Sequence, residues 1–238
     1  MRVVLWNCKG GLQRKDKVEY LLSFKPDIAI IPEIRKAHVQ ALKPMDFCWV
    51  TNHPDGRSPK GLGVLCFGNY RLECLPRDEE MEIYLPLKIR NGSFSFNLLA
   101  IWNFYSLCKR GRFRGARGEA GVELAALHHY RAFLPDPSLL IGDLNMGPTL
   151  SLECFSRLSG LLEEMGLKDL SRISTEQRSK VFHWKTFRMK RKEQFFYHHL
   201  DHAFGSMSFS ERLDSFQIDE QAMDKFSDHA PVIIIFAD

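Results

Sequence analysis

Polar side chains stand directly after short apolar runs at distant places in this sequence, and this pattern constrains the fold most. The places are Trp6-Asn7-Cys8-Lys9-Gly10, Ile31-Pro32-Glu33, Ala100-Ile101-Trp102-Asn103, Ile141-Gly142-Asp143-Leu144-Asn145, His199-Leu200-Asp201 and Ser227-Asp228-His229. Folds of the α/β class gather functional groups at the C-terminal ends of their strands. The pattern therefore predicts that polar groups from across the chain meet at one end of a sheet.

The apolar runs themselves predict an alternating α/β chain. Strands are expected over residues 2–7, 27–31, 47–51, 62–67, 81–89, 94–102, 138–142, 199–204 and 230–237, where β-branched and aromatic residues are frequent. Helical spacing predicts helices over 15–25, 119–134 and 151–166. No repeat or linker interrupts the pattern, which predicts a single domain over residues 1–238 with two sheets packed face to face and helices outside.

The composition is that of an ordinary globular protein. With 238 residues, of which 45% are hydrophobic, the chain can bury a large core. Its longest apolar runs are far shorter than the roughly 20 residues that cross a bilayer, so no membrane partner is expected. The N-terminus lacks the apolar stretch of a signal peptide, which predicts a cytosolic protein.

The six cysteines form no CxxC pair and stand mostly within apolar stretches. A reduced thiol packs there as a small hydrophobic group. We therefore expect neither a disulfide nor a zinc knuckle.

Each polar site has a structural explanation when it is considered alone. Asn7 could end a strand, Glu33 could be a solvated loop charge, and Asp143 with Asn145 could form a turn. Together, however, they supply what hydrolysis of a phosphodiester needs. That set comprises carboxylates for a metal, a group that activates water, neutral donors for phosphoryl oxygens and an oriented imidazole.

In order and spacing, these motifs resemble the endonuclease/exonuclease/phosphatase superfamily, which includes abasic-site endonucleases and pancreatic-type deoxyribonucleases. The resemblance rests on Trp6-Asn7, Glu33, Gly142-Asp143-Leu144-Asn145, Leu200-Asp201 and Ser227-Asp228-His229-Ala230-Pro231-Val232, and thus spans nearly the whole chain. It is strongest to compact bacterial members, in which the strand that contains the aspartate follows a Thr-Phe pair like Thr186-Phe187. The resemblance implies a four-layer α/β/β/α sandwich like that of deoxyribonuclease.

The resemblance also implies roles for individual residues. Glu33 would be the principal Mg²⁺ ligand, with Asn7 and Asp228 near the metal; Mn²⁺ could replace Mg²⁺. Asp143 would position or deprotonate the attacking water, and Asn145 would hold a phosphoryl oxygen. His229 would donate to the developing pentavalent phosphate, and Asp201 would orient the imidazole ring.

Two positions depart from the family pattern. Family members commonly carry Asn or Asp where this chain has Lys9, which puts a second metal position in doubt. A mid-chain position often filled by Tyr or His falls near Asn103, which we predict as a phosphate contact.

Histidines near the C-terminus offer a second interpretation. The run Tyr197-His198-His199-Leu200-Asp201-His202 nearly matches the H-x-H-x-D-H zinc signature of metallo-β-lactamase-like hydrolases, but Tyr197 replaces the first ligand. A zinc hydrolase is therefore an alternative.

Two basic runs could contact nucleic acid. The first, Lys109 to Arg117, predicts phosphate contacts by Arg110, Arg112, Arg114 and Arg117, or else is a solvated loop. The second, Lys185 to Lys192, predicts contacts by Lys185 and Arg188, and the rings of Phe187, Phe195 and Phe196 could stack on bases. Alternatively, it is a hairpin whose aromatic residues face the core.

The sequence thus predicts a Mg²⁺-dependent phosphodiester hydrolase, specifically a nuclease acting on DNA, with no protein partner evident. A phosphatase or phosphodiesterase for small phosphate esters, a zinc hydrolase, and a catalytically inactive member that binds nucleic acid are the alternatives.

Overall fold

Two six-stranded sheets form the centre of the computed structural model, which describes residues 1–51, 59–79, 81, 83–103, 121–173 and 184–237. The first sheet has the order β13-β14-β1-β2-β4-β3 and the second β5-β6-β7-β8-β12-β9. The strands of the first sheet are β13 (Leu213–Ile218), β14 (Val232–Phe236), β1 (Arg2–Leu5), β2 (Ile28–Arg35), β4 (Lys60–Cys66) and β3 (Asp46–Val50). Those of the second are β5 (Arg71–Cys74), β6 (Ile83–Asn91), β7 (Phe94–Trp102), β8 (Ser138–Asp143), β12 (Asp201–Gly205) and β9 (Lys168–Asp169).

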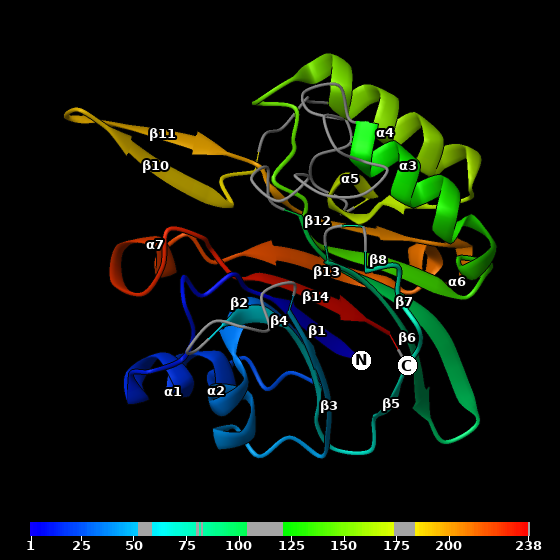
Figure 1. Cartoon of the computed structure of the whole chain (residues 1–238), viewed down its shortest axis with the longest axis horizontal. Coiled ribbons are helices and arrows are strands. Elements are labelled where there is room, and N and C mark those ends of the chain that lie inside the picture. The colour runs from blue at the N-terminus through cyan, green and yellow to red at the C-terminus, as the bar shows by residue number, and fades with distance from the viewer. Residues whose placement is uncertain (52–58, 80, 82, 104–120, 174–183, 238) are drawn as a thin grey trace.

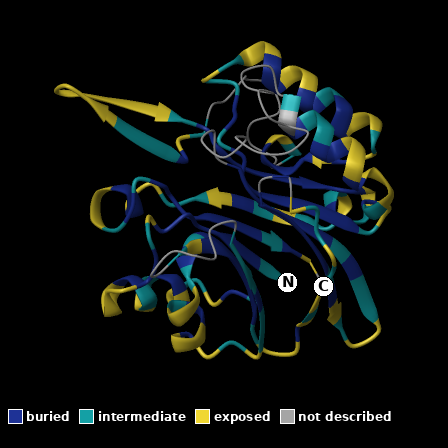
Figure 2. Cartoon of the chain, in the orientation of Figure 1, coloured by how far each residue is buried: buried dark blue, intermediate teal, exposed yellow. Residues whose placement is uncertain are grey.

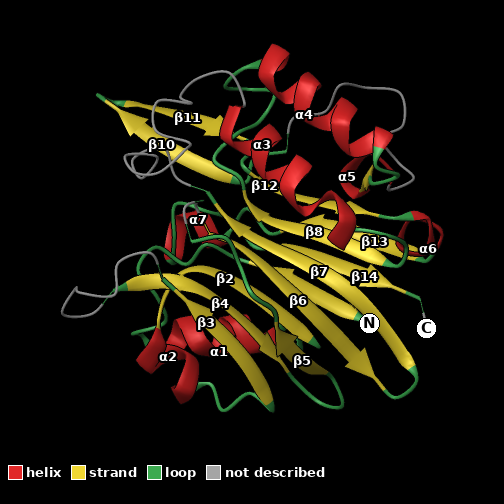
Figure 3. Ribbon diagram, turned by 45° about the vertical axis from the view of Figure 1, so that its right-hand side comes forward, coloured by secondary structure: helices red, strands yellow, loops and turns green. Residues whose placement is uncertain are grey.

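Helices cover the outer faces of both sheets (Figures 1 and 3). Helices α1 (Lys15–Ser23) and α2 (Lys36–Ala41) lie on the first sheet, and α3 (Gly121–Tyr130) and α4 (Leu152–Glu164) lie on the second. The shorter helical segments are a 3-10 turn (Arg131–Phe133), α5 (Leu170–Ile173), α6 (Met207–Glu211) and α7 (Ala222–Lys225). The predicted four-layer α/β/β/α sandwich is therefore confirmed.

Alternation along the strands explains the layers. In β1, Val3 and Leu5 belong to the apolar cluster between the sheets, whereas Val4 belongs to the cluster beneath α1 and α2. Because neighbouring side chains of a strand point to opposite faces, a strand with apolar residues at every position is buried on both sides. No helix among the described residues is long and apolar enough to cross a membrane.

A β-hairpin stands apart from the sandwich. Strands β10 (Phe187–Arg191) and β11 (Gln194–His198) form a two-stranded sheet of their own, which a β-bridge between Phe187 and His229 joins to the body, and the hairpin extends away from the body of the molecule (Figure 1). The residues of β11 are largely exposed, as the colours of Figure 2 show. The predicted alternative in which the aromatic residues of this segment face the core is therefore wrong for Phe195 and Phe196, which are 50% and 43% exposed.

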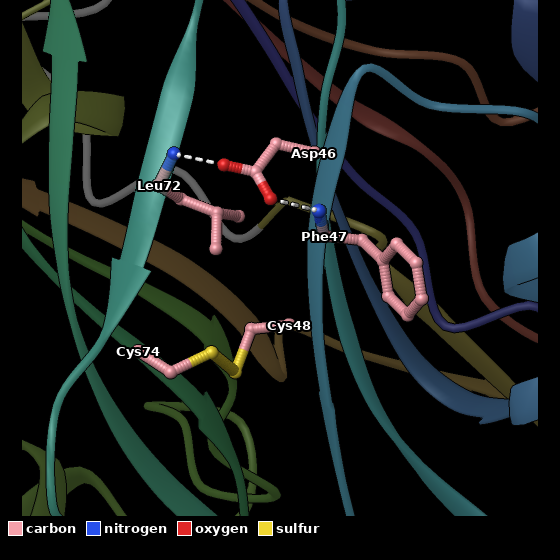
Figure 4. Close-up of a disulfide and its surroundings, with 5 residues drawn as sticks. All are labelled: Asp46, Phe47, Cys48, Leu72 and Cys74. Atoms are coloured by element: carbon pink, nitrogen blue, oxygen red, sulfur yellow. Dashed lines mark hydrogen bonds between the residues drawn. A yellow bond between two sulfur atoms is a disulfide. The ribbon is translucent and has the colours of Figure 1, made fainter.

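The expectation of no disulfide is also wrong. Cys48 in β3 and Cys74 in β5 form a disulfide that joins the edges of the two sheets (Figure 4). Beside it, a carboxylate oxygen of Asp46 accepts a hydrogen bond of 2.9 Å from the backbone of Leu72, which also links the edges. The pair was missed because the closeness of two strands in different sheets cannot be inferred from cysteine spacing. Cys8, Cys66 and Cys154 are buried thiols outside the disulfide, as expected.

Candidate active site

Two buried carboxylates lie opposite each other at one end of the second sheet. Asp143 is the last residue of β8, Asp201 is the first residue of β12, and the two are directly paired across the antiparallel strands. Both are fully buried. Gly142 allows this arrangement, because a Cβ at this position would lie 2.1 Å from the carbonyl oxygen of Ile101 in the neighbouring strand. The Gly-Asp motif thus lets β8 pack close to β7 and ends it in a buried acid.

His229 is held against Asp201. Its Nδ1 lies 2.8 Å from Oδ2 of Asp201, and its backbone carbonyl accepts a hydrogen bond of 3.0 Å from the indole of Trp6. The ring of Phe187, at the start of the projecting hairpin, lies 4.7 Å from the imidazole, centroid to centroid. These contacts fix both the position and the ring orientation of the histidine.

The electrostatics of this cluster favour opposite charges on its acid and imidazole. Burial raises the pKa of Asp143 to about 7, and the nearby carboxylate of Asp201 adds to the rise while His229 opposes it. Burial alone would lower the pKa of His229, but the carboxylates of Asp201 and Asp143 outweigh it and raise this pKa to about 9. At a pH between these two pKa values, the carboxyl of Asp143 is ionised and the imidazole of His229 carries a proton.

Asn7 connects the buried cluster to a second group of acids. Its Nδ2 donates to Oδ2 of Asp143 at 2.9 Å and lies 3.3 Å from Oε1 of Glu33. Its backbone carbonyl accepts a hydrogen bond of 2.7 Å from the hydroxyl of Ser227, in the loop that carries His229. Residues from both sheets are therefore joined at one end of the sandwich.

Glu33 and Asp228 form the more exposed part of the site. Glu33 lies at a register shift in β2 and has a φ of 60°, in the left-handed region that non-glycine residues seldom adopt. Its Oε2 lies 2.5 Å from the ammonium of Lys60, and Oδ2 of Asp228 lies 2.9 Å from that of Lys9. Each acid is thus paired with a lysine.

Asn145 and Asn103 are linked beside Asp143. The side-chain amide of Asn145 donates to the backbone carbonyl of Asn103, and its backbone amide donates to Oδ1 of Asp143 at 3.0 Å. Asn103 is buried, and its own amide donates to Glu123 at 2.5 Å. This geometry is that of a residue that positions Asn145, and the predicted contact of Asn103 with phosphate stays a prediction.

Histidines of the zinc-like run do not form a metal cluster among the described residues. The Nε2 atom of His202 faces two backbone carbonyls, those of Met146 and His199, at 2.8 and 3.1 Å. The cluster with suitable ligand spacing in the described part of the chain is Asp143, Asp201 and His229, whose ligand atoms lie within 4.8 Å of one another. A metal ion could be held there, but below the His229 pKa of about 9 the imidazole would first have to give up its proton.

The predicted nucleic-acid contacts divide into two sets. Arg188 belongs to the projecting hairpin and Lys185 lies just before it; the cation of Lys185 is 4.9 Å from the ring of Tyr197, and that of Arg188 is 4.8 Å from the ring of Phe195. Arg188 also pairs with Asp224, and its backbone amide donates to the carbonyl of Asp228 at 2.8 Å. Arg110, Arg112, Arg114 and Arg117 lie outside the described residues.

Two further residues position the loops of the site. Lys17 is buried, donates its ammonium to the backbone carbonyl of Cys8, and so holds the loop after Asn7. The hydroxyl of Thr186 accepts hydrogen bonds of 2.8 and 3.1 Å from the backbone amides of Leu200 and Asp201. Lys17 falls within a helical pattern and looks like a surface residue, so its role requires the fold.

Solved structures with the same fold include several enzymes that act on nucleic acids. A 3'-5' exonuclease from Neisseria meningitidis matches with a TM-score of 0.69 and 18% identity, covering 100% of each chain. An AP endonuclease from Archaeoglobus fulgidus matches with a TM-score of 0.68 and 14% identity, covering 99% of each chain. The endonuclease domain of TRAS1, a telomere-specific non-LTR retrotransposon, matches with a TM-score of 0.67 and 16% identity, over 99% of this chain and 97% of that one.

The chain therefore shares the fold of these solved structures. No protein-family model matches the sequence, and no curated protein matches it significantly. The similarity thus shows the fold, and the reaction that the site can catalyse follows from its side chains.

Proposed function

We propose that this protein is a Mg²⁺-dependent phosphodiester hydrolase that acts on DNA, with Mn²⁺ as a possible replacement for Mg²⁺. The observation that supports it most is the meeting of a buried His229–Asp201 pair with Asp143 at the sheet end that also carries Glu33. The sandwich would act as one catalytic domain over residues 1–238.

The donor set at the exposed part of the site fits a hard divalent cation. Glu33, Asp228 and the side-chain oxygen of Asn7 are oxygen donors, which Mg²⁺ prefers. The two carboxylates already attract cations, because each holds a lysine ammonium. A bound Mg²⁺ would supply charge stabilisation at the phosphoryl oxygens and the leaving oxygen.

Asp143 is suited to activate water. A carboxyl with a pKa of about 7 is ionised at slightly alkaline pH, yet is basic enough to accept a proton. In the proposed reaction a water oxygen forms a bond to phosphorus while its proton passes to Asp143. The bond from phosphorus to the opposite ester oxygen breaks, and that oxygen takes up a proton from solvent to leave as a hydroxyl group. Asn145, whose backbone amide is bonded to Asp143, would orient the phosphate beside the water.

His229 is suited to stabilise the transition state. With Nδ1 facing Asp201 and a pKa of about 9, its ring is protonated at neutral pH and presents Nε2 as a charged donor. Such a donor is preorganised, so it stabilises the charge that develops on the pentavalent phosphate.

The projecting hairpin supports a nucleic-acid substrate, and DNA is proposed because a solved structure with this fold, a 3' phosphatase from Neisseria, is bound to a product DNA hairpin. The cations of Arg188 in the hairpin and of Lys185 just before it lie beside exposed aromatic rings, and Phe187 at the base of the hairpin touches His229. Exposed rings next to cations suit the stacking of unpaired bases and the binding of phosphates. Contacts by Arg110, Arg112, Arg114 and Arg117 stay predictions.

Hydrolysis of a substrate panel would test the proposal. Abasic duplex, single-stranded DNA, RNA and a chromogenic phosphodiester are incubated with Mg²⁺, Mn²⁺, Zn²⁺ or chelator. We expect cleavage of DNA with Mg²⁺ or Mn²⁺ and none with chelator. Activity restored by Zn²⁺ alone would favour a zinc hydrolase, and tight DNA binding without cleavage of any substrate would favour an inactive binder.

We also propose a cytoplasmic location, which the Cys48–Cys74 pair puts to the test. Cytosolic thiols are mostly kept reduced, so this location predicts free thiols at Cys48 and Cys74 in protein alkylated at lysis. Recovery of the disulfide in that experiment would instead favour an oxidising compartment.

A further inference from the structure

Two lysine ammonium groups lie on the acids that the proposed function assigns to the metal. Lys60 Nζ is 2.5 Å from Oε2 of Glu33, and Lys9 Nζ is 2.9 Å from Oδ2 of Asp228. The acid side chains are 22% and 27% exposed, and both pairs are open to water. Cations of the protein and of the solution would therefore compete for the same oxygens.

Lys60 is directed to Glu33 by the fold. It is the first residue of β4 and pairs with Arg35, two residues beyond Glu33 in β2. Its side chain crosses Gly10, where a Cβ would lie 3.5 Å from Cε of Lys60. Gly10 has a φ of 85°, so glycine is favoured there for its backbone conformation as well. The pairing of β4 with β2 and the loop at Gly10 therefore both place the ammonium group beside Glu33.

Lys9 reaches Asp228 from a tight turn. Its φ of 47° is left-handed, and its backbone amide donates to Oδ1 of Asn7 at 3.1 Å. From this turn the ammonium reaches Asp228 in the loop before β14. Its side chain is 63% exposed, so the pair can open without disturbing the core.

We propose that Lys9 and Lys60 are built-in counter-ions that compete with the divalent cation for Asp228 and Glu33, and so weaken metal binding. This inference rests on the proposed function. Partly exposed ion pairs are weak, and a divalent cation can replace them. Each ammonium nevertheless opposes the incoming cation by charge repulsion, because it lies within a few ångströms of the ligand oxygens. Removing one lysine charge should therefore raise metal affinity about five- to tenfold.

Calorimetric titration of the whole protein with Mn²⁺ would test this without relying on activity. The variants are Lys9→Met and Lys60→Met, singly and combined, which remove the charge but keep most of the side chain. Lys60→Arg keeps the charge. Lys15→Met removes an exposed lysine whose ammonium lies 3.5 Å from Glu19 on α1, and serves as the matched control.

We expect each methionine variant to bind Mn²⁺ about five- to tenfold more tightly, and the double variant more tightly still. Lys60→Arg and Lys15→Met should stay within about twofold of the unaltered chain. Unchanged or weaker binding in both single methionine variants would overturn the inference, as would an equal gain in Lys15→Met.

Glu33→Gln separates failure of this inference from failure of the proposed function. If Glu33→Gln loses Mn²⁺ binding while the lysine variants bind like the unaltered chain, the metal position stands and the counter-ion role is wrong. If Glu33→Gln binds as well as the unaltered chain, the ion lies elsewhere and both proposals fail. Binding that appears only after the lysines are removed would support the counter-ion role.

Discussion

The two parts of the site differ in how they handle charge. Asp143, Asp201 and His229 are buried; the two acids stand at the paired ends of strands β8 and β12, and His229 is hydrogen-bonded to Asp201. Glu33 and Asp228 are partly exposed and are each neutralised by a lysine. Burial preorganises the first part for proton transfer and charge stabilisation, whereas exposure lets the second exchange one cation for another. A metal-dependent hydrolase needs both a preorganised buried group and an exchangeable cation site.

Removal of His229 should have the largest effect, because its contribution arises in the transition state. We expect His229→Ala to lower kcat about 10²–10⁴-fold while DNA affinity is largely kept. Single-turnover cleavage together with equilibrium binding measures both. His128→Ala, which removes an exposed histidine on α3, is the control. An equal loss of binding and turnover would show that His229 acts mainly by holding substrate.

Glu33→Gln tests the exposed part. The carboxylate is the proposed principal ligand, so we expect the Mg²⁺ concentration for half-maximal activity to rise about 10–100-fold. Titration of cleavage rate with Mg²⁺ measures this. Should the variant keep the metal requirement of the unaltered chain, the division between the two parts of the site would be wrong.

The Asp201→Asn variant tests how the buried residues Asp143, Asp201 and His229 set the pH range of activity. Activity should rise with pH through the Asp143 pKa of about 7, because the base must be ionised, and fall through the His229 pKa of about 9, because the donor must be protonated. A bound divalent cation lowers both pKa values, so both limbs of the pH profile move to lower pH. The variant removes the anion that raises the His229 pKa, so the falling limb should move to lower pH and kcat should drop about 10–100-fold.

That prediction is checked by rate profiles of the variant and the unaltered chain at one Mg²⁺ concentration. A falling limb that stays in place would mean that His229 is not the group that titrates there.

The projecting hairpin should have the smallest effect, because it lies outside the reacting centre. Replacing Phe195 and Phe196 by alanine should weaken binding of single-stranded DNA about tenfold and leave kcat unchanged. Met45→Ala removes another exposed apolar side chain, far from the hairpin in sequence, and is the control. A change in kcat without a change in binding would place the hairpin in catalysis instead.

Much of the fold could be predicted from the sequence, since long apolar runs such as β6, β7 and β14 are unambiguous. Strands β5, β9 and β13 were not predicted, because they are short, polar or at sheet edges, where local residue patterns are weak. Acids at strand ends could be recognised because each directly follows an apolar run. Lys60 and Lys17 could not, because their roles depend on which distant segments the fold of the first sheet brings beside them.

Anomalous diffraction from crystals containing Mn²⁺ would test the division of the site most directly. We predict one peak within coordination distance of Glu33 and Asp228, with His229 still bonded to Asp201. A peak among Asp143, Asp201 and His229, or none at this end of the sandwich, would contradict it.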